Sequence, residues 1–391
     1  MQYKPYGQTG IRVSILGFGA MRLPGEEGKT DPEMSAPILR RGLDLGINYI
    51  DTAHGYGKGN NEVAVGHAIR GYDRSKLFIV TKIPVGSEED AQSAVWRKKL
   101  DLSLERLDTP IDLLLFHGLR WNVYETLLTR PNMALAEARQ AQSEGLIRHI
   151  GFSSHDTAEN IISLVDTGEF AGMLVQYNYL DRHNEPAIAH AAEKGMGVTI
   201  MGPVAGGRLA LPQGILVDTE GALEVKTPEM ALRFVWSNPA VTVALSGMNA
   251  ITQVEENVAS ANRLGVLDGR EGAYIQALME KNQKLADLYC TGCEYCMPCP
   301  NDVNIAENFR YMNWFRVWGM EKEARAAYER LGKENNWAPW MGGGAIHGLK
   351  AEACAQCGEC LPKCPQNIAI IDQLQEVAAM LGTKAPAAQG S

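Results

Sequence analysis

The sequence predicts an α/β protein: a (β/α)8 barrel of the TIM type, followed by a small, mainly helical domain that contains the cysteines. Three observations support this prediction. The chain has 391 residues, more than the roughly 250 to 300 that one hydrophobic core usually organises. Residues 13–260 alternate short apolar runs with helix-length amphipathic segments. All eight cysteines lie between Cys290 and Cys364.

Eight apolar runs have the length of β-strands and are bounded by turn residues. They are Val13–Gly19, Asn48–Ala53, Leu77–Ile83, Ile111–His117, His149–Ser153, Met173–Asn178, Val198–Gly202 and Val241–Ser246. Strands that alternate with helices favour parallel pairing through right-handed crossovers. Closure into a barrel accounts best for eight such units in about 250 residues. An open Rossmann sheet is the weaker interpretation, because no Gly-x-Gly-x-x-Gly motif follows an early strand.

The segment after the third run shows how a helix of this barrel is expected to begin. Ser87 can cap a helix, and Asp90, three residues later, completes a capping box. The apolar residues that follow share one helical face: Trp96, Leu100, Leu104 and Leu107. We therefore expect one continuous helix here, packed on the barrel.

Charge and hydropathy exclude several classes of partner. The formal net charge is −9, with lysine and arginine dispersed, so the chain lacks the basic footprint of a nucleic-acid or anionic-membrane binder. No run of about 18 apolar residues could span a bilayer. Residues 1–10 lack the basic-then-apolar order of a signal peptide. We expect a cytoplasmic protein with neither nucleic acid nor membrane as a partner.

Polar residues end three consecutive apolar runs. Asp51 ends the second run, with Tyr56 on the loop after it, Lys82 ends the third and His117 the fourth. In a parallel barrel these ends lie on the same face. Taken singly, Asp51 could be a turn or helix cap, and His117 a structural histidine. Lys82 is harder to explain in this way, because lysine is almost never fully buried unless paired.

Together these four residues can transfer a proton. An unperturbed tyrosine has a pKa of about 10, and a nearby ammonium group stabilises the phenolate and lowers that pKa. Asp51 would keep Lys82 charged and oriented. Tyr56 could then give a proton to a carbonyl oxygen as the carbonyl carbon receives hydride, and take it back in the reverse reaction. His117 would donate a hydrogen bond to the same oxygen.

Residues 1 to about 262 resemble the aldo-keto reductase family. The matching stretches are Gly46–Ala53 with Tyr56-Gly57, Thr81-Lys82, Ile111–Leu113 with His117, Gly151–Ser154, Gln176–Asn178 and Glu255–Asn257. The resemblance implies a barrel that binds NADP or NAD, with Asp51, Tyr56, Lys82 and His117 as its catalytic tetrad. It also implies hydride transfer to an aldehyde or ketone, or from an alcohol or sugar, with Tyr56 as general acid and base.

The same resemblance implies three groups of cofactor-binding residues. Ser153, Ser154 and Gln176 would bind the nicotinamide carboxamide. The loop Pro203–Leu209, with Gly206, Gly207 and Arg208, would pass over the pyrophosphate, where glycines let backbone amides approach. Ser246, Gly247, Gln253 and Asn257 would meet the adenosine half. Met201 stands after the seventh strand, where the family often has an aromatic residue that stacks on the nicotinamide.

The choice between NAD and NADP stays open. NADP-specific members of the family have an arginine or lysine after the last strand to pair with the 2′-phosphate, whereas this chain has Ser246-Gly247-Met248-Asn249. Recognition of a phosphate favours a charged fork. Arg208 or Arg263 could supply that charge instead.

The cysteines form two closely spaced runs. The first is Cys290-x2-Cys293-x2-Cys296-x2-Cys299-Pro300, and the second is Cys354-x2-Cys357-x2-Cys360-x3-Cys364-Pro365. The second has the bacterial ferredoxin spacing, and the first is one residue shorter. A zinc site needs only four thiolates, so two such runs favour two 4Fe-4S clusters over zinc or disulfides.

In two-cluster ferredoxins the fourth cysteine of each run ligates the other cluster. We therefore predict two ligand sets: Cys290, Cys293 and Cys296 with Cys364, and Cys354, Cys357 and Cys360 with Cys299. Residues 305–331 are expected to be helical. We expect four tryptophans to pack against the clusters or the barrel: Trp314, Trp318, Trp337 and Trp340. The predicted boundaries are 1–265 for the barrel, 266–285 for a connecting helix, 286–375 for the ferredoxin-like domain and 376–391 for a C-terminal tail.

A barrel followed by such a domain resembles the ferredoxin-fused branch of the aldo-keto reductases. A nicotinamide passes two electrons as hydride, whereas a cluster accepts one. Either the clusters are structural, or a flavin or a redox partner protein mediates. The main hypothesis is an oxidoreductase for a small carbonyl compound or sugar. One alternative is an electron-transfer module whose barrel is a binding scaffold, and another is a regulatory subunit that keeps the nicotinamide site without useful turnover.

Overall fold

A computed structural model gives the fold of the chain. It describes residues 1–26, 28–207, 209, 215–217, 224–263, 269–282, 290, 295–316, 320–332, 347–365 and 367–382. The chain divides into two compact units, one of residues 1–203 and 228–269, the other of residues 204–227 and 270–391. Among the described residues, no helix is both long enough and apolar enough to cross a membrane.

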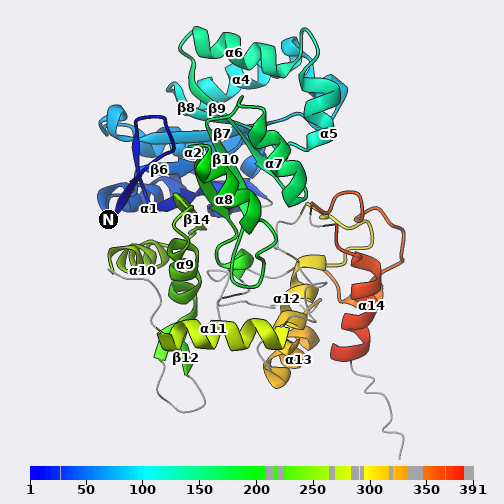
Figure 1. Cartoon of the computed structure of the whole chain (residues 1–391). Helices are drawn as coiled ribbons and strands as arrows, with labels where there is room; N and C mark the ends of the chain where they lie inside the picture. The colour runs from blue at the N-terminus through cyan, green and yellow to red at the C-terminus, as the bar shows by residue number, and fades with distance from the viewer. Residues whose placement is uncertain are drawn as a thin grey trace, which may run out of the picture. The chain divides into compact units, whose positions relative to one another are not determined.

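Eight parallel strands close into a barrel in the first unit (Figure 1). In barrel order they are β3 (Leu16–Gly19), β6 (Tyr49–Asp51), β7 (Phe78–Pro84), β8 (Ile111–His117), β9 (Ile147–Ser154), β10 (Gly172–Gln176), β11 (Gly197–Met201) and β14 (Val243–Gly247), which pairs with β3. Each strand overlaps one of the eight predicted apolar runs. The predicted barrel is therefore confirmed.

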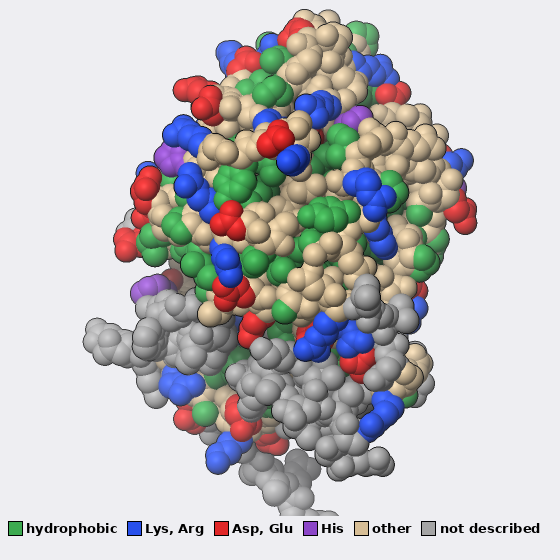
Figure 2. All heavy atoms as spheres, turned by 90° about the vertical axis from the view of Figure 1, so that its left-hand side faces the viewer, with side chains coloured by type: hydrophobic (Ala, Val, Ile, Leu, Met, Phe, Trp, Pro, Cys, Tyr) green, Lys and Arg blue, Asp and Glu red, His purple; other side chains and the backbone are tan. Residues whose placement is uncertain are grey.

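Helices follow the strands and cover the barrel (Figure 1). They are α1 (Pro32–Asp44), α2 (Asn60–Ile69), α4 (Ser93–Leu107), α6 (Ala134–Ser143), α7 (Ala158–Asp166), α8 (Glu185–Glu193), α9 (Thr227–Ser237) and α10 (Ile251–Asn262). Each of those with described side chains buries one apolar face, as α7 does with Ile161 and Leu164. On the face that Figure 2 shows, the acidic and basic side chains drawn in colour are interspersed.

The first predicted run is two strands rather than one. A hairpin of β1 (Tyr3–Pro5) and β2 (Arg12–Ser14) precedes the barrel strand β3. The chain turns at Ile15 because Ser14 bonds in two directions: its N–H donates to Asn48 Oδ1 at 2.7 Å, and its hydroxyl donates to the Leu16 carbonyl at 2.7 Å.

Aromatic side chains fill the barrel at the N-terminal ends of its strands. Tyr6, Tyr49 and Phe78 pack together with ring centroids 5.0 to 5.7 Å apart. The hydroxyls of Tyr6 and Tyr49 lie 3.1 and 3.0 Å from Thr199 Oγ1, so the polar tips of this layer are hydrogen-bonded. A side chain at Gly197 would overlap the Tyr6 ring. This end is packed core, which leaves the C-terminal ends of the strands for a site.

The helix expected after the third strand is also interrupted. Ser87 caps it as predicted, accepting from the Asp90 N–H at 3.1 Å, but α3 (Glu88–Ala91) ends at once and α4 begins at Ser93. The Ser93 N–H donates to the Asn132 carbonyl at 3.0 Å, which draws the backbone out of the helix. Within α4 the face of Trp96, Leu100 and Leu107 is buried as expected, and Leu104 is half-buried.

The described part of the second unit is mainly helical. It contains α11 (Gly269–Asn282), α12 (Ile305–Arg316), α13 (Glu321–Arg330), the short η8 (Ala351–Ala353) and α14 (Ile370–Leu381), besides the strand pair β12 (Ile215–Val217) and β13 (Glu224–Lys226). Trp314 is buried in the core of this unit, with its ring 5.4 Å from that of Tyr311. Trp318, Trp337 and Trp340 lie outside the described residues.

The second unit differs from the predicted boundaries in two places. Helix α14 continues to Leu381, past the predicted boundary at residue 375, because Val377 and Leu381 are buried in the same core. The segment 204–227, predicted as part of the barrel, groups with the second unit. Helix α11 lies within the segment predicted as a connecting helix.

Candidate active site

Lys82 and Asp51 form a buried ion pair at the ends of neighbouring strands. Lys82 Nζ donates to Asp51 Oδ1 at 2.5 Å and to the Thr52 carbonyl at 2.7 Å. Lys82 is 1% exposed and Asp51 is 3% exposed. Burial raises the pKa of Asp51, and the Lys82 charge opposes this rise. A charge so buried requires a partner, so each group depends on the other.

Tyr56 and His117 lie beside this pair. Tyr56 begins the short helix η2 (Tyr56–Gly59), which follows β6, and its ring centroid is 4.8 Å from Lys82 Nζ. The His117 ring meets the Tyr56 ring edge-on, with centroids 5.7 Å apart and planes at 83°. Both rings are half-buried. The structure therefore brings all four predicted catalytic residues together.

The loop that carries Tyr56 is held by residues that the sequence reasoning did not identify. Gly57 has a φ of +54°, and a β-carbon there would overlap Thr30. Arg106 donates to the His54 carbonyl at 3.0 Å and pairs with Glu62 at 3.2 Å. Glu62 in turn accepts from the Thr81 hydroxyl at 2.6 Å. A buried glutamate in an apolar helix was the signal that could have pointed to this network.

The His117 imidazole is neutral over the physiological pH range. Burial, with the Lys82 charge and His155 as smaller causes, lowers the pKa of His117 to about 3. His155 follows β9, and burial together with the Arg120 charge lowers its pKa to about 4. A neutral imidazole can donate one hydrogen bond from its ring N–H. His117 thus suits the role of hydrogen-bond donor better than that of proton source.

Gln176 carries a buried hydrogen-bond donor that is unused among the described residues. Its Nε2 atom has no partner there, although the side chain is only 3% exposed. Gly202, with a φ of +64°, lies against this amide: a β-carbon at Gly202 would be 2.5 Å from Gln176 Nε2. A buried donor without a partner is costly, which is expected where a ligand supplies the acceptor. The Gln176 amide therefore fits a carboxamide ligand.

Ser153 and Ser154 both support the loop after β8. Ser153 Oγ accepts from the Gly118 N–H at 3.0 Å. The Ser154 hydroxyl donates to the Leu119 carbonyl at 2.7 Å and accepts from the Asp156 N–H at 3.1 Å. The Ser154 hydroxyl proton is thus donated within the protein, whereas the Ser153 hydroxyl oxygen acts as an acceptor.

The residues predicted to meet the adenosine half gather after β14. Asn257 Nδ2 donates to Ser246 Oγ at 3.0 Å, and Gln253 Oε1 accepts from the Asn249 N–H at 2.9 Å. Gly247 ends the strand. Arg263 could supply the positive charge that NADP-specific members of the family have after the last strand. It is paired with Glu229 at 2.6 Å.

The remaining cofactor predictions concern the loop after β11. Met201 is partly exposed at the strand end and packs against the barrel core, and Pro203 is buried. Gly206 and Gly207 have left-handed φ values of +65° and +92°, a conformation that glycine adopts without strain. Arg208 lies outside the described residues.

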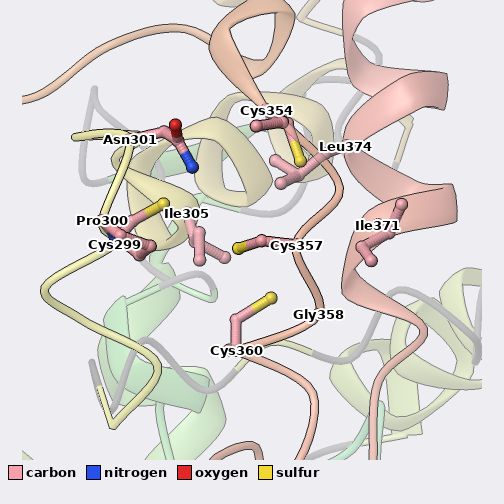
Figure 3. A pocket seen from close by; sticks show the side chains of 11 residues that line it. Cys299, Pro300, Asn301, Ile305, Cys354, Cys357, Gly358, Cys360, Ile371 and Leu374 are labelled. Carbon is pink, nitrogen blue, oxygen red and sulfur yellow. The ribbon is translucent and has the colours of Figure 1, made fainter.

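In the second unit, four cysteines line one pocket. They are Cys299, Cys354, Cys357 and Cys360, which line this pocket together with Ile305 and Leu374. Figure 3 shows their sulfur atoms turned toward this common space. Burial and then the neighbouring thiols raise the pKa of Cys360. The pocket contains one complete predicted ligand set.

Backbone pairing outside the cysteine runs brings the two runs together. Val303, after the first run, forms a parallel bridge with Leu349, before the second. The Asn304 N–H donates to the Leu349 carbonyl at 3.0 Å, and the Leu349 N–H donates to the Asp302 carbonyl at 2.6 Å. Asn308 Nδ2 also donates to the Leu349 carbonyl, at 3.1 Å. This bridge places Cys299 beside the second run.

The other predicted ligand set is described in part. Cys296 and Cys364 are buried in one apolar cluster, Cys290 packs against it, and Cys293 lies outside the described residues. None of the described cysteines forms a disulfide. Among the described residues, no group of three or more His, Cys, Asp or Glu side chains is arranged to hold a single metal ion.

Comparisons with known proteins agree with both units. Residues 15–213 match the aldo/keto reductase family, and residues 289–369 match a 4Fe-4S dicluster domain. An uncharacterized oxidoreductase, YqkF of Bacillus subtilis, is 29% identical over 296 residues, which cover 67% of this chain and 92% of the relative. L-galactose dehydrogenase of Arabidopsis thaliana is 27% identical over 310 residues, which cover 73% and 96%.

Among solved structures, the aldo-keto reductase AKR11C1 of Bacillus halodurans in its holo form superposes with a TM-score of 0.59 and 30% identity, covering 71% of this chain and 96% of the other. The barrel strand order and the cysteine-lined pocket agree with these matches. The chain belongs to the aldo/keto reductase family of oxidoreductases and carries a 4Fe-4S dicluster domain after its barrel.

Proposed function

We propose that this protein reduces an aldehyde or ketone, or oxidises the corresponding alcohol or sugar, with Tyr56 as the general acid and base. The observation that carries this proposal is the position of Lys82 Nζ, 4.8 Å from the Tyr56 ring centroid and paired with Asp51. Bound NADPH or NADH would supply the hydride. The chain's own residues supply the proton and the geometry.

Tyr56 gives its phenolic proton to the carbonyl oxygen. The Lys82 ammonium group stabilises the phenolate that remains, because an opposite charge nearby favours the ionised form. Asp51 holds Lys82 in place at 2.5 Å. In the reverse direction the phenolate, which the Lys82 charge keeps populated, takes the proton from the alcohol.

His117 positions the substrate oxygen. Its ring lies edge-on to Tyr56, so a carbonyl oxygen can lie near both. With a pKa of about 3, the imidazole stays neutral and donates its N–H to that oxygen. A donor aimed at developing negative charge stabilises the transition state more than the ground state.

The dinucleotide is proposed to lie along the C-terminal ends of the strands. Ser153 and Gln176 bind the carboxamide, and Ser154 fixes the loop beside them. Gly206, Gly207 and Arg208 approach the pyrophosphate. Ser246, Gly247, Gln253 and Asn257 contact the adenosine half. The substrate class is a small carbonyl compound or sugar, in line with the sugar named for the Arabidopsis relative.

Two 4Fe-4S clusters are proposed for the second unit, each held by three cysteines of one run and the last cysteine of the other. The pocket of Cys299, Cys354, Cys357 and Cys360 supports this crossed arrangement. Each cluster passes one electron at a time, whereas hydride carries two. The clusters therefore stabilise the fold, or they exchange electrons through a flavin or a redox partner protein.

Substitution of Tyr56 by phenylalanine tests the catalytic proposal. The protein is purified anaerobically, its iron, flavin and nicotinamide contents are measured, and carbonyl compounds and sugars are screened with NADPH and NADH. Tyr56→Phe should bind dinucleotide normally and lose about 10²- to 10⁴-fold in kcat, the usual contribution of general acid catalysis. Tyr72→Phe, which removes an exposed hydroxyl bonded to Asp44, is the matched control. A Tyr56→Phe enzyme with wild-type turnover would refute Tyr56 as the acid.

The second candidate is an electron-transfer module, favoured by the four-thiol pocket. Cluster reduction by NADPH or NADH is followed by electron paramagnetic resonance, with and without added flavin. Reduction of the clusters without turnover of any compound in the panel supports this candidate over the reductase.

A further inference from the structure

The backbone that follows Tyr56 turns through an unusual conformation. Gly57, Lys58 and Gly59 have left-handed φ values of +54°, +54° and +91°. Glycine adopts such values without strain, whereas lysine rarely adopts them. Backbone of this kind persists only where its surroundings fix it. The position of the Tyr56 phenol therefore depends on what holds residues 54–59.

The Arg106 guanidinium group contacts this loop on both sides of Tyr56. Arg106 comes from α4, and its Nη1 atom donates to the His54 carbonyl at 3.0 Å, before Tyr56 in the chain. After Tyr56, a β-carbon at Gly59 would be 2.6 Å from both Cζ and Nη2 of Arg106. The guanidinium group thus fills the space where a side chain at position 59 would begin, and it bridges the two ends of the loop.

Arg106 is itself held by a buried carboxylate. Its Nη1 atom also donates to Glu62 Oε2 at 3.2 Å, and the Glu62 side chain is fully buried. Glu62 Oε1 accepts from the Thr81 hydroxyl at 2.6 Å. The His54 N–H donates to the Lys82 carbonyl at 2.9 Å. The loop and the residues that support it are therefore both fixed to the segment of β7 that carries Lys82.

A buried ion pair of this kind contributes little net stability, because well-packed apolar residues of similar volume can often replace it without loss. The contact with the His54 carbonyl, by contrast, requires an N–H donor at that point. We propose that Arg106 is a positioning residue that bridges this loop and holds Tyr56 beside Lys82. Arg106 acts through the loop and not on the substrate. The inference rests on the proposed function, because it takes Tyr56 as the general acid.

The first test is Arg106→Met in the full-length holoprotein, which keeps most of the side-chain stem and removes the N–H donors. Turnover is measured with the fastest substrate of the carbonyl panel. A displacement of about 1 Å near the reacting atoms can cost about 100-fold in rate, so kcat should fall about 10- to 100-fold. The dissociation constants of NADPH and NADH should stay unchanged. A folded Arg106→Met variant with wild-type kcat would overturn the inference.

A second variant keeps the test valid if Arg106→Met does not fold, since that substitution leaves Glu62 buried without its cation. Arg106→Met with Glu62→Gln removes both charges, and the new amide oxygen can still accept from the Thr81 hydroxyl. This double variant should fold and show the same loss in kcat. Wild-type turnover in the folded double variant would contradict the inference.

Tyr56→Phe, alone and combined with Arg106→Met, tests whether Arg106 acts through Tyr56. If it does, Arg106→Met should change the residual turnover of Tyr56→Phe by less than about 2-fold, because the group that it positions is gone. A further loss of about 10- to 100-fold would mean that Arg106 acts by another route, and the inference would fail while Tyr56 remained the acid. Wild-type turnover of Tyr56→Phe would instead refute the proposed function.

Arg106→Lys separates position from charge. Lysine keeps the positive charge but lacks the planar fork, so its kcat should remain closer to that of Arg106→Met than to that of the wild type. Full recovery would show that a charge alone suffices and that the bridge is not needed. Arg70→Met is the matched control, because Arg70 is exposed and lies 3.8 Å from Asp108; it should keep wild-type kcat. Thermal unfolding of every variant is measured alongside.

Discussion

Lys82 Nζ donates to Asp51 Oδ1 inside the barrel mouth, and neither charge reaches bulk water. The two residues come from adjacent strands, β6 and β7, whose register places Asp51 opposite Val80, two residues before Lys82. Lys82 therefore reaches back to Asp51 while its ammonium group faces Tyr56. One cation serves both the fold and the proposed proton transfer.

Removal of one partner of this pair should cost more than removal of both. Lys82→Met leaves the Asp51 carboxyl group buried without its cation and should lower the free energy of unfolding by about 3 to 5 kcal/mol. Lys82→Met with Asp51→Asn should recover part of that loss. Urea denaturation measures both. Arg70→Met, at an exposed pair, should cost less than about 1 kcal/mol. Strict additivity of the two single substitutions would contradict the coupling.

The free energy of unfolding should decrease as the pH is lowered below about 6.5, where a histidine in the unfolded chain begins to take up a proton. The pKa of His117 in the folded protein is lowered to about 3, and the pKa values of His54 and His155 to about 4. The unfolded chain therefore binds more protons between pH 6.5 and 4, and stability is lost as pH falls through that window. His117→Gln should reduce the slope by about 1.4 kcal/mol per pH unit. Unfolding curves at several pH values measure it, and an unchanged slope would show that His117 titrates normally.

Gln176→Met should weaken dinucleotide binding without harming the fold. Its Nε2 atom is buried and has no partner in the described part of the chain. Removal of this atom therefore removes the desolvation penalty of an unsatisfied donor in the unliganded protein. We expect dinucleotide dissociation constants to rise about 10-fold, with a melting temperature equal to or above that of the wild type. Gln140→Met, at an exposed amide bonded to Glu144, is the control. A clear loss of stability with unchanged binding would indicate a structural role for Gln176.

The crossed arrangement of cysteines predicts which substitutions share a phenotype. The wild type should contain about eight iron atoms per chain, as two 4Fe-4S clusters require. Cys299→Ser and Cys354→Ser should each disturb the same cluster signal in electron paramagnetic resonance, because both side chains line one pocket. Cys364→Ser should disturb the other signal, together with Cys290→Ser. If Cys299→Ser instead matches Cys290→Ser, each run holds its own cluster.

The sequence predicted the barrel well because its signals are local. Each strand is a short apolar run, and Asp51, Lys82 and His117 stand at the point where such a run ends. Parallel pairing then places these ends on one face whatever the details of the loops. Asp112, which belongs to one of the matching stretches, lies instead near the start of β8. There it accepts from the Ile79 N–H at 2.8 Å and pairs with Arg74.

What the sequence did not predict depends on contacts between distant residues. The break at Ile15 follows from a bond between Ser14 and Asn48, 34 positions apart. The position of Cys299 beside the second run follows from the pairing of Val303 with Leu349. Neither contact leaves a periodic pattern in the chain.

The aromatic side chains of Tyr6, Tyr49 and Phe78 fill the barrel interior at the N-terminal ends of its strands, so the barrel is open only at the opposite end. Nothing can pass through it, so any molecule that reacts at Tyr56 enters and leaves by the mouth at the strand ends. Two ligands that share one opening must be taken up and released in sequence when one covers the other. The three packed rings at the N-terminal ends of the strands thus constrain the order in which two ligands bind at the C-terminal ends.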